Sequence, residues 1–245
     1  GGLVSPPSLY SIDNSLRAGE AGTFAALLPP DHDSPVTVLA SQGNIGFGAA
    51  HNRLMATAFA DGADFYLCLN PDALLHRRAL AELGAAVLPR VTALYEMRQF
   101  PTEHPKHYAP DTGDTLWVSG CAVAIPRDVF ERVGGFDEHL FMYCEDVDLS
   151  WRVRKAGGRC IMVPRALVHH DLANRQPDPL TEHRFLISGH HLATKWSLKE
   201  LVRRLERRMW ETGVPVPAPA AERLRAPNIA TDVHLFSFSP VRWTL

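Results

Sequence analysis

The chain has 245 residues, a net charge of −2 and 46% hydrophobic residues, which suits one large globular domain or a domain with an appendage. The near-neutral charge argues against a nucleic-acid partner, because such proteins usually carry a clear basic excess. The cysteines form no Cys-x-x-Cys pair, so we expect the reduced thiols of a cytoplasmic protein: Cys68, Cys121, Cys144 and Cys160. We expect neither a membrane span nor a signal peptide.

Alternating strand and helix patterns in the first third predict an α/β fold. Short apolar runs bounded by turn residues predict strands over 8–12, 36–40 and 65–69. Segments of helical spacing follow them over 16–28, 47–60 and 76–87. This order predicts a mostly parallel central sheet with helices on both faces. Asp13 and Asp72 each follow a strand, at the sheet edge where ligands of such folds bind.

The rest of the chain is expected to cover the site and to add an appendage. Residues 98–116 are polar and proline-rich and predict a mobile acceptor-side loop near Asp146. Further strands are expected over 117–125, interrupted by Ser119-Gly120, and over 159–163. We therefore divide the chain into a catalytic domain, an amphipathic helical segment, and a Pro-rich linker with a terminal strand, over 1–180, 181–213 and 214–245.

Five acidic side chains lie among aromatic residues between Gly134 and Arg152. Burying an unpaired carboxylate costs several kcal/mol, so acids in such surroundings are expected to have a chemical role. Glu145 and Asp146 fall at the start of a predicted helix, where the helix dipole favours ionised carboxylates that can act as a general base. Helix capping explains one of these acids, and Asp148 can pair with Arg152 at the i, i+4 spacing.

This acidic stretch resembles the acceptor-side motif of family 2 glycosyltransferases, inverting enzymes of the GT-A fold, and most nearly their bacterial rhamnosyltransferase-like branch. Segments 9–15, 44–52 and 65–72 match further motifs in the family's order, and the resemblance covers residues 8–172. It implies transfer of rhamnose or another hexose from a dTDP- or UDP-sugar, with inversion, in surface polysaccharide biosynthesis. The acceptor would be a saccharide or lipid-linked. The alternative is a non-catalytic glycosyltransferase-like binding module.

The resemblance also assigns roles to particular residues. Asp146 would be the general base with Glu145 beside it, and Asp72 and His170 would hold Mg²⁺ or Mn²⁺. The implied nucleotide-binding residues are Asp13, Asn14, Asn44, Gly46 and Asn70. The implied acceptor-binding residues are Trp117, Ser119 and Gly120.

Structural interpretations compete with several of these roles. Asn70-Pro71-Asp72 has the composition of a turn, and Asp13 that of an Asx turn. Gly46 and Gly48 permit close approach to a ligand, but also suit a glycine-rich turn before a helix. A histidine such as His170 is more often structural than a ligand. The basic residues of 195–208 either form a solvated helix face or make a peripheral contact with anionic lipid at the inner membrane face.

The family's usual first strand is missing from the start of the chain, because only residues 1–7 precede the run 8–12. The apolar run 233–238 has the length and character of a buried strand that could fill the vacant place. That interpretation predicts parallel pairing of 233–238 with both 8–12 and 65–69. The alternative is a strand at a sheet edge, or one exchanged with a second molecule.

Overall fold

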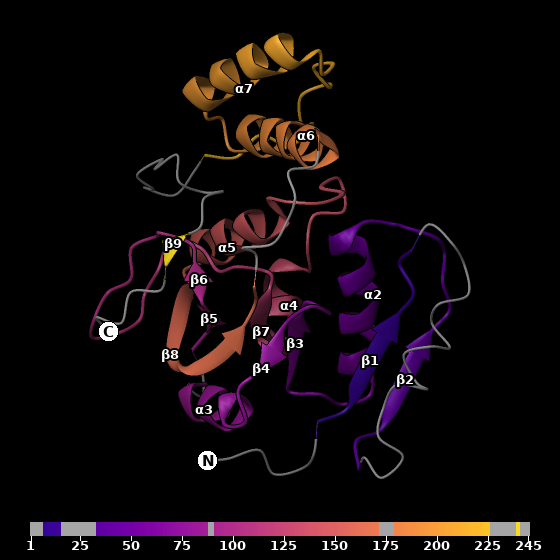
Figure 1. Ribbon diagram of the computed structural model, residues 1–245, viewed down its shortest axis with the longest axis vertical. Coiled ribbons are helices and arrows are strands. Elements are labelled where there is room, and N and C mark those ends of the chain that lie inside the picture. The colour runs from indigo at the N-terminus through magenta and orange to yellow at the C-terminus, as the bar shows by residue number, and fades with distance from the viewer. Residues whose placement is uncertain (1–6, 16–32, 88–90, 172–178, 226–238, 241–245) are drawn as a thin grey trace.

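A five-stranded sheet lies at the centre of the molecule, with a separate parallel pair beside it (Figure 1). The computed structural model describes residues 7–15, 33–87, 91–171, 179–225 and 239–240. The central strands, in spatial order, are β3 (Phe65–Leu69), β7 (Ala122–Pro126), β5 (Ala93–Phe100), β8 (Arg159–His169) and β4 (Leu74–Leu75). The separate pair is β1 (Leu9–Ile12) and β2 (Val36–Leu39).

The central sheet is mixed, which corrects the expectation of a mostly parallel one. Strands β5 and β8 run parallel, whereas β7 is antiparallel to both β3 and β5, and β4 is antiparallel to β8. The connection from β5 to β7 contains no helix, since residues 101–121 are all described and irregular apart from β6 (Thr102–Glu103). A crossover helix is the usual way to return a strand in the parallel direction.

Helices cover both faces of the sheet, as predicted. One face packs against α2 (Phe47–Ala60), α4 (Arg127–Val133) and α5 (Glu145–Lys155). The other packs against α3 (Ala79–Ala86). Strand β3 shows the alternation that this requires, because Tyr66 and Cys68 enter the first core while Phe65, Leu67 and Leu69 pack on the second.

Two further helices, α6 (Pro179–Lys195) and α7 (Lys199–Thr212), pack together at one end of the molecule (Figure 1). The helical segment expected over 181–213 thus consists of two helices separated at residues 196–198, where Ser197 has a φ of 57°. Trp151 of α5 and Trp196 meet edge to face with ring centroids 5.5 Å apart. This contact joins the helical pair to the sheet domain. None of the described helices has both the length and the apolarity needed to cross a membrane.

Most predicted elements of the first third are confirmed. The strands over 8–12, 36–40 and 65–69 and the helix over 47–60 match within a residue at each end. The helix predicted over 76–87 is shorter, and the one over 16–28 lies outside the described residues. The strand predicted over 117–125 starts only at Ala122, and the one over 159–163 continues to His169.

The region 98–116 differs from the exposed loop that its prolines predict. It begins inside β5 and continues into β6, which pairs with β9 (Ser239–Pro240). Several of its polar side chains are buried, namely Arg98, Glu103, His104 and Lys106, whereas His107, Asp111 and Thr112 are exposed. The predicted strand 233–238 lies outside the described residues, so its pairing stays a prediction.

Candidate functional site

The acidic residues of the predicted site follow a backbone turn of unusual conformation. Tyr143 and Cys144 have φ values of 73° and 68°, and α5 begins directly afterwards at Glu145. A non-glycine residue in this region costs on the order of 1–3 kcal/mol, so the surrounding packing must hold the turn in place. The turn places Glu145 and Asp146 in the first turn of α5.

Asp146 is fixed by backbone donors on both oxygens. Its Oδ2 accepts a hydrogen bond from the N–H of Gly120 at 2.9 Å, and its Oδ1 accepts one from Val147 at 2.8 Å. A Cβ at position 120 would lie 3.2 Å from the ring of Phe47 and 3.6 Å from the Cβ of Asp146. The turn before β7 therefore approaches α5 closely, and glycine makes room for it.

Burial changes the protonation of this acid pair. Glu145 is 6% exposed, and its Oε2 has no hydrogen-bond partner in the described structure. Burial and then the charge of Asp146 raise the pKa of Glu145 well above its usual range. Burial also raises the pKa of Asp146, although the N–H groups of Gly120 and Val147 oppose the shift. The expectation that the helix dipole keeps both acids readily ionised is corrected, because desolvation outweighs it.

A buried ion pair that sequence reasoning missed supports the segment facing Asp146. Lys106 Nζ lies 2.7 Å from Glu96 Oε2 and donates a 2.7 Å hydrogen bond to the carbonyl of Trp117. Glu96 Oε1 accepts a 3.0 Å hydrogen bond from the N–H of Ser119. Burial raises the pKa of Glu96 despite the nearby ammonium. No local pattern predicts this pair, since Lys106 lies in an irregular stretch and Glu96 in an apolar strand.

The three residues predicted to contact an acceptor are buried in this conformation. Trp117 and Ser119 are 4% and 5% exposed, and Gly120 is also buried. The ring of Trp117 lies 4.0 Å from Lys106 Nζ, a cation–π contact. Of the three, Gly120 donates a hydrogen bond to Asp146, while Trp117 and Ser119 bind Lys106 and Glu96. A direct contact of these residues with an acceptor stays a prediction.

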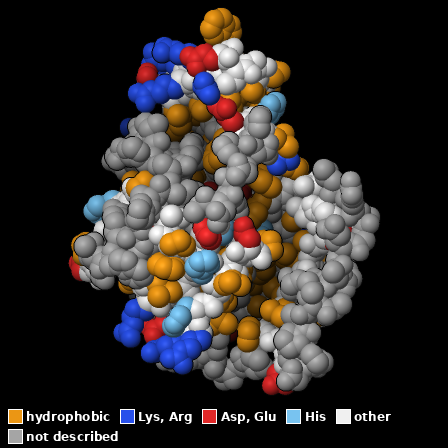
Figure 2. All heavy atoms as spheres, viewed as in Figure 1, with side chains coloured by type: hydrophobic (Ala, Val, Ile, Leu, Met, Phe, Trp, Pro, Cys, Tyr) orange, Lys and Arg blue, Asp and Glu red, His pale blue; other side chains and the backbone are white. Residues whose placement is uncertain are grey.

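Asp72 and His170, the predicted metal ligands, meet in space. Asp72 Oδ1 lies 3.4 Å from His170 Nε2, and the Asp72 side chain is half exposed. The imidazole is buried and positioned by the side chain of Gln99, with its Nδ1 3.1 Å from Oε1. In the space-filling view, acidic side chains and histidines gather near the middle of the face that carries β4 (Figure 2).

The donor set of this pair fits a divalent ion. Two ligands at about 2.1 Å in neighbouring octahedral positions are about 3 Å apart, close to the distance between these two atoms. An accessible carboxylate suits Mg²⁺ or Mn²⁺, and imidazole suits Mn²⁺ better than Mg²⁺. Only small movements would be needed for Asp72 and His170 to hold one ion.

Asn70 connects the metal-ligand candidates with the acid pair. Its backbone N–H donates to the carbonyl of Cys121 at 2.9 Å, and its own carbonyl accepts from Ala73 at 3.1 Å. The second bond closes a turn, so the turn interpretation of 70–73 is confirmed, and that turn carries Asp72. Because Gly120 and Cys121 are consecutive, one segment contacts both Asp146 and the turn bearing Asp72.

The predicted nucleotide-binding residues at the end of β1 form a connected loop. Asp13 Oδ1 accepts from Ser15 N–H at 3.0 Å, which confirms the Asx turn. The amide of Asn14 accepts from Ile45 N–H at 2.8 Å and donates to the carbonyl of Gly46 at 3.0 Å. Asn14 thereby joins β1 to the loop preceding α2, and nucleotide contact by these residues stays a prediction.

Gly46 and Gly48 permit a close approach, but to another part of the chain. Gly46 has a φ of 88°, and a Cβ there would lie 2.5 Å from the carbonyl oxygen of Phe141. A Cβ at Gly48 would lie 2.9 Å from the Cβ of Phe136. In this structure these glycines let the start of α2 pack on the segment leading to the acids, and their approach to a ligand stays a prediction. The glycine-rich turn before a helix is confirmed.

A series of polar side chains, linked by short contacts, reaches the carbonyl of Gly120 from α2 and β3. His51 Nδ1 is 2.7 Å from the hydroxyl of Tyr66, and Cys68 Sγ is 3.4 Å from His51 Nε2. The Cys68 thiol donates to the carbonyl of Gly120 at 3.1 Å. Burial lowers the pKa of His51 to about 4, so the ring is neutral at physiological pH. The motif over 44–52 predicted the helix that carries His51 but not this contact.

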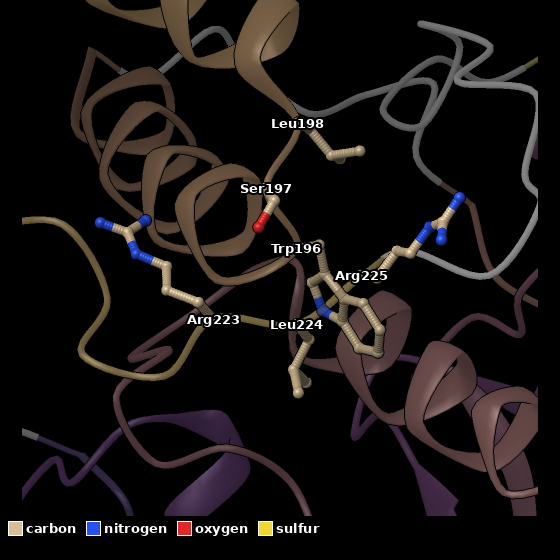
Figure 3. A pocket seen from close by; sticks show the side chains of 6 residues that line it. All are labelled: Trp196, Ser197, Leu198, Arg223, Leu224 and Arg225. Atoms are coloured by element: carbon tan, nitrogen blue, oxygen red, sulfur yellow. The ribbon is translucent and has the colours of Figure 1, made fainter.

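Two cavities lie beside the helical pair, and neither is lined by the acid pair. One of about 450 Å³ is lined by Trp196, Leu198 and Leu224 together with polar side chains (Figure 3). In that view the guanidinium groups of Arg223 and Arg225 extend in different directions. A second, of about 620 Å³, lies between α6, α7 and the segment around Pro217. Neither contains a candidate catalytic residue.

Residues 68–209 match the family model described as glycosyltransferase like family 2, so the match includes the acid pair, Asp72 and His170. The chain belongs to glycosyltransferase family 2. The matched region runs past residue 180 and ends in α7. The resemblance found in the sequence is thereby confirmed.

Characterised relatives of this family 2 chain include rhamnosyltransferases. It is 37% identical over 107 residues to N-acetylglucosaminyl-diphospho-decaprenol L-rhamnosyltransferase of Mycobacterium tuberculosis, covering 43% of this chain and 31% of that relative. It is 30% identical over 209 residues to rhamnosyltransferase WbbL of Escherichia coli, covering 69% of this chain and 73% of WbbL. The chain thus spans about a third of the mycobacterial relative's length.

Comparison with solved structures confirms the GT-A fold. The mannosyltransferase PcManGT of Pyrobaculum calidifontis, solved in complex with GDP-Man and Mn²⁺, aligns with a TM-score of 0.54 and 15% identity. The alignment covers 84% of this chain and 59% of that structure. At this identity the likeness concerns the arrangement of strands and helices.

Proposed function

We propose that this chain transfers a hexose, rhamnose in the first place, from a nucleotide-diphosphate donor to a saccharide or lipid-linked acceptor with inversion. The observation that supports the proposal is that two consecutive residues, Gly120 and Cys121, connect the acid pair with the turn that carries Asp72. Gly120 N–H binds the carboxylate of Asp146, and the Cys121 carbonyl binds the turn that carries Asp72. An acid pair that can accept a proton and a site that can hold a cation are thus fixed to the same backbone segment.

In this proposal Asp146 is the general base. It takes the proton of the acceptor hydroxyl, and the oxygen attacks the anomeric carbon opposite the departing nucleoside diphosphate, which inverts the configuration. The raised pKa makes Asp146 a stronger base than an exposed aspartate. We propose that Asp146 is the ionised member of the acid pair, because its two oxygens accept hydrogen bonds from the N–H groups of Gly120 and Val147, whereas Glu145 Oε2 has no such donor in the described structure.

Asp72 and His170 are proposed to hold Mg²⁺ or Mn²⁺. When bound, the ion would neutralise charge on the departing diphosphate. The exposed carboxylate of Asp72 faces outward, while the buried His170 is held by β5, so one ligand is adaptable and the other fixed. We propose that a dTDP- or UDP-sugar binds at Asp13, Asn14, Asn44 and Gly46, which lie in the two loops that Asn14 joins, and at Asn70 in the turn bearing Asp72.

The direct test is nucleotide binding by the whole chain. Thermal unfolding is followed with dTDP, UDP or ATP, each with and without Mn²⁺. Binding to the native state raises the melting temperature through a free-energy gain of RT ln(1 + [L]/Kd). We expect a shift with dTDP or UDP that requires Mn²⁺, and little shift with ATP. If millimolar dTDP and UDP leave unfolding unchanged, the chain is instead a non-catalytic glycosyltransferase-like binding module.

We further propose a peripheral contact with the cytoplasmic face of a membrane, as a lipid-linked acceptor would require. Trp210 on α7 is 84% exposed, and Lys and Arg side chains gather at the same end of the molecule (Figure 2). Against this, Arg203, Arg204 and Arg208 pair with glutamates, as a solvated face would. Flotation with anionic vesicles decides: binding lost in Trp210→Ser supports the contact, and no binding supports the solvated face.

A further inference from the structure

A cluster of ionisable side chains lies between the acidic segment and α6, outside the proposed catalytic site. Asp137 and His139 both lie in the loop before α5, while His191 lies on α6. Asp137 Oδ1 is 2.9 Å from His139 Nδ1, and its Oδ2 is 3.4 Å from His191 Nε2. The two imidazole rings are stacked, with centroids 5.6 Å apart and planes 9° apart.

We propose that Asp137, His139 and His191 form a binding site for a divalent transition-metal ion of the Zn²⁺ class. One ligand atom from each residue can be chosen so that all lie within 4.8 Å of one another. Zinc takes nitrogen and carboxylate ligands at about 2.0–2.1 Å in a tetrahedron, so its ligand atoms are about 3.3 Å apart. The separations of 2.9 Å and 3.4 Å involve different oxygens of Asp137, so the side chains would move closer together to place one oxygen and both nitrogens around an ion.

The chemistry of the ligands selects the class of ion. Imidazole nitrogens suit Zn²⁺, Cu²⁺ and Ni²⁺, whereas Mg²⁺ prefers oxygen ligands alone. The side chain of His139 is 82% exposed, so solvent can reach the ion and supply a fourth ligand. This donor set differs from that of Asp72 and His170, which contains a single imidazole and an exposed carboxylate.

Asp137 shares a buried ammonium group with a second carboxylate. Lys195 Nζ lies 2.7 Å from Asp137 Oδ2 and 3.0 Å from Asp148 Oδ1. When an ion binds Asp137, Lys195 keeps Asp148 as its partner and need not become an unpaired buried charge.

The position of the site indicates what a bound ion would do. Asp137 and His139 lie in the loop that leads to the acid pair, and His191 lies on the helix that packs over α5 through Trp196. A metal bridge would hold α6 to that loop, in addition to the contact of Lys195 with Asp148. The ion is therefore expected to stabilise the junction of the helical pair with the sheet domain, and the inference is independent of sugar transfer.

The test is Zn²⁺ titration of the whole chain by calorimetry, in a Asp72→Asn background that removes the other candidate site. His139→Ala and His191→Ala are compared with His107→Ala, which removes an exposed histidine elsewhere. Loss of even an outer-shell partner costs about 10–100-fold in metal affinity, so each ligand variant is expected to weaken Zn²⁺ by more than tenfold and His107→Ala to leave it unchanged. Unfolding in EDTA confirms that the variants fold.

Cobalt gives an independent readout of the coordination. Co²⁺ added to the same background should give the visible d–d absorption of a tetrahedral nitrogen and oxygen site, and His139→Ala should abolish it. Since His139 is mostly exposed, this substitution should change the melting temperature in EDTA little. The proposal is overturned if the parent chain binds no Zn²⁺, or if His139→Ala and His191→Ala bind it as tightly as His107→Ala.

Discussion

Asp72 and His170 lie 3.4 Å apart, although they follow strands β3 and β8, which are not neighbours in the sheet. The short strand β4 brings them together, because it follows the turn carrying Asp72 and pairs with the end of β8. Substituting Asp72→Asn keeps the shape of the turn but removes the charge that would bind a cation. We expect the Mn²⁺-dependent thermal shift with dTDP to be lost, whereas Asp111→Asn, at an exposed position, should retain it.

Glu145→Gln should stabilise the chain at neutral pH. Because burial raises the pKa of Glu145 above its value in the unfolded chain, the contribution of this group to stability is present at low pH and is lost as the pH rises towards the folded-state pKa. A neutral glutamine avoids that loss. The melting-temperature gain over wild type should therefore grow from pH 5 to pH 8. A gain that instead grows as the pH falls would contradict the desolvated state of Glu145.

Lys106→Met should destabilise the fold strongly. It leaves Glu96 buried without its ammonium partner, and breaking a buried pair costs about 3–5 kcal/mol. The double variant Lys106→Met, Glu96→Gln removes both charges and should recover a large part of the loss in urea unfolding. Equal stability of the single and double variants would show that the pair is not energetically coupled.

Gly46→Ala tests the contact between the start of α2 and the segment before the acids. An added Cβ would lie 2.5 Å from the Phe141 carbonyl, and the backbone at φ 88° and ψ 166° disfavours alanine by about 1–3 kcal/mol. Gly62→Ala is a matched control, because its φ is 97° but no atom lies within 4 Å of the added Cβ. Urea unfolding should show Gly46→Ala to be less stable than Gly62→Ala by about 1–3 kcal/mol, as for overpacking. Equal losses of stability would mean that the loop around Phe141 moves away from the added Cβ at no cost in free energy.

Local patterns in the sequence predicted the strands β1, β2 and β3 and the helix α2, because hydrophobic periodicity and turn residues specify such elements directly. The resemblance to family 2 glycosyltransferases paired Asp72 with His170, and the structure brings the two side chains to 3.4 Å, while their roles and that of Asp146 stay predictions. The ion pair of Glu96 and Lys106 could not be predicted, because it depends on how β5 and the following segment return past the sheet. The mixed strand directions could not be predicted for the same reason, because they too depend on the path that the chain takes after β5.

Local patterns also failed to predict which polar side chains are buried. The prolines of 98–116 correctly excluded a helix, but exposure holds only for part of the segment, such as Asp111, because side chains such as Arg98 and Lys106 find partners within the sheet domain. The same applies to Glu145, whose position at a helix start predicted an ionised acid. Its desolvation follows from tertiary packing, and desolvation of a carboxylate outweighs a helix dipole.

Sugar transfer by Asp146→Asn tests the central claim most directly. The asparagine keeps the size of the side chain but cannot accept the acceptor's proton, and loss of a general base lowers the rate by about 10²–10⁴-fold. Transfer from dTDP-rhamnose to a lipid-linked or free saccharide acceptor is measured with Mn²⁺ for wild type and Asp146→Asn, with Asp111→Asn as control. The account predicts transfer with inverted anomeric configuration by wild type and the control, and a loss of that size in Asp146→Asn with dTDP binding retained. Transfer by Asp146→Asn at the wild-type rate would contradict it.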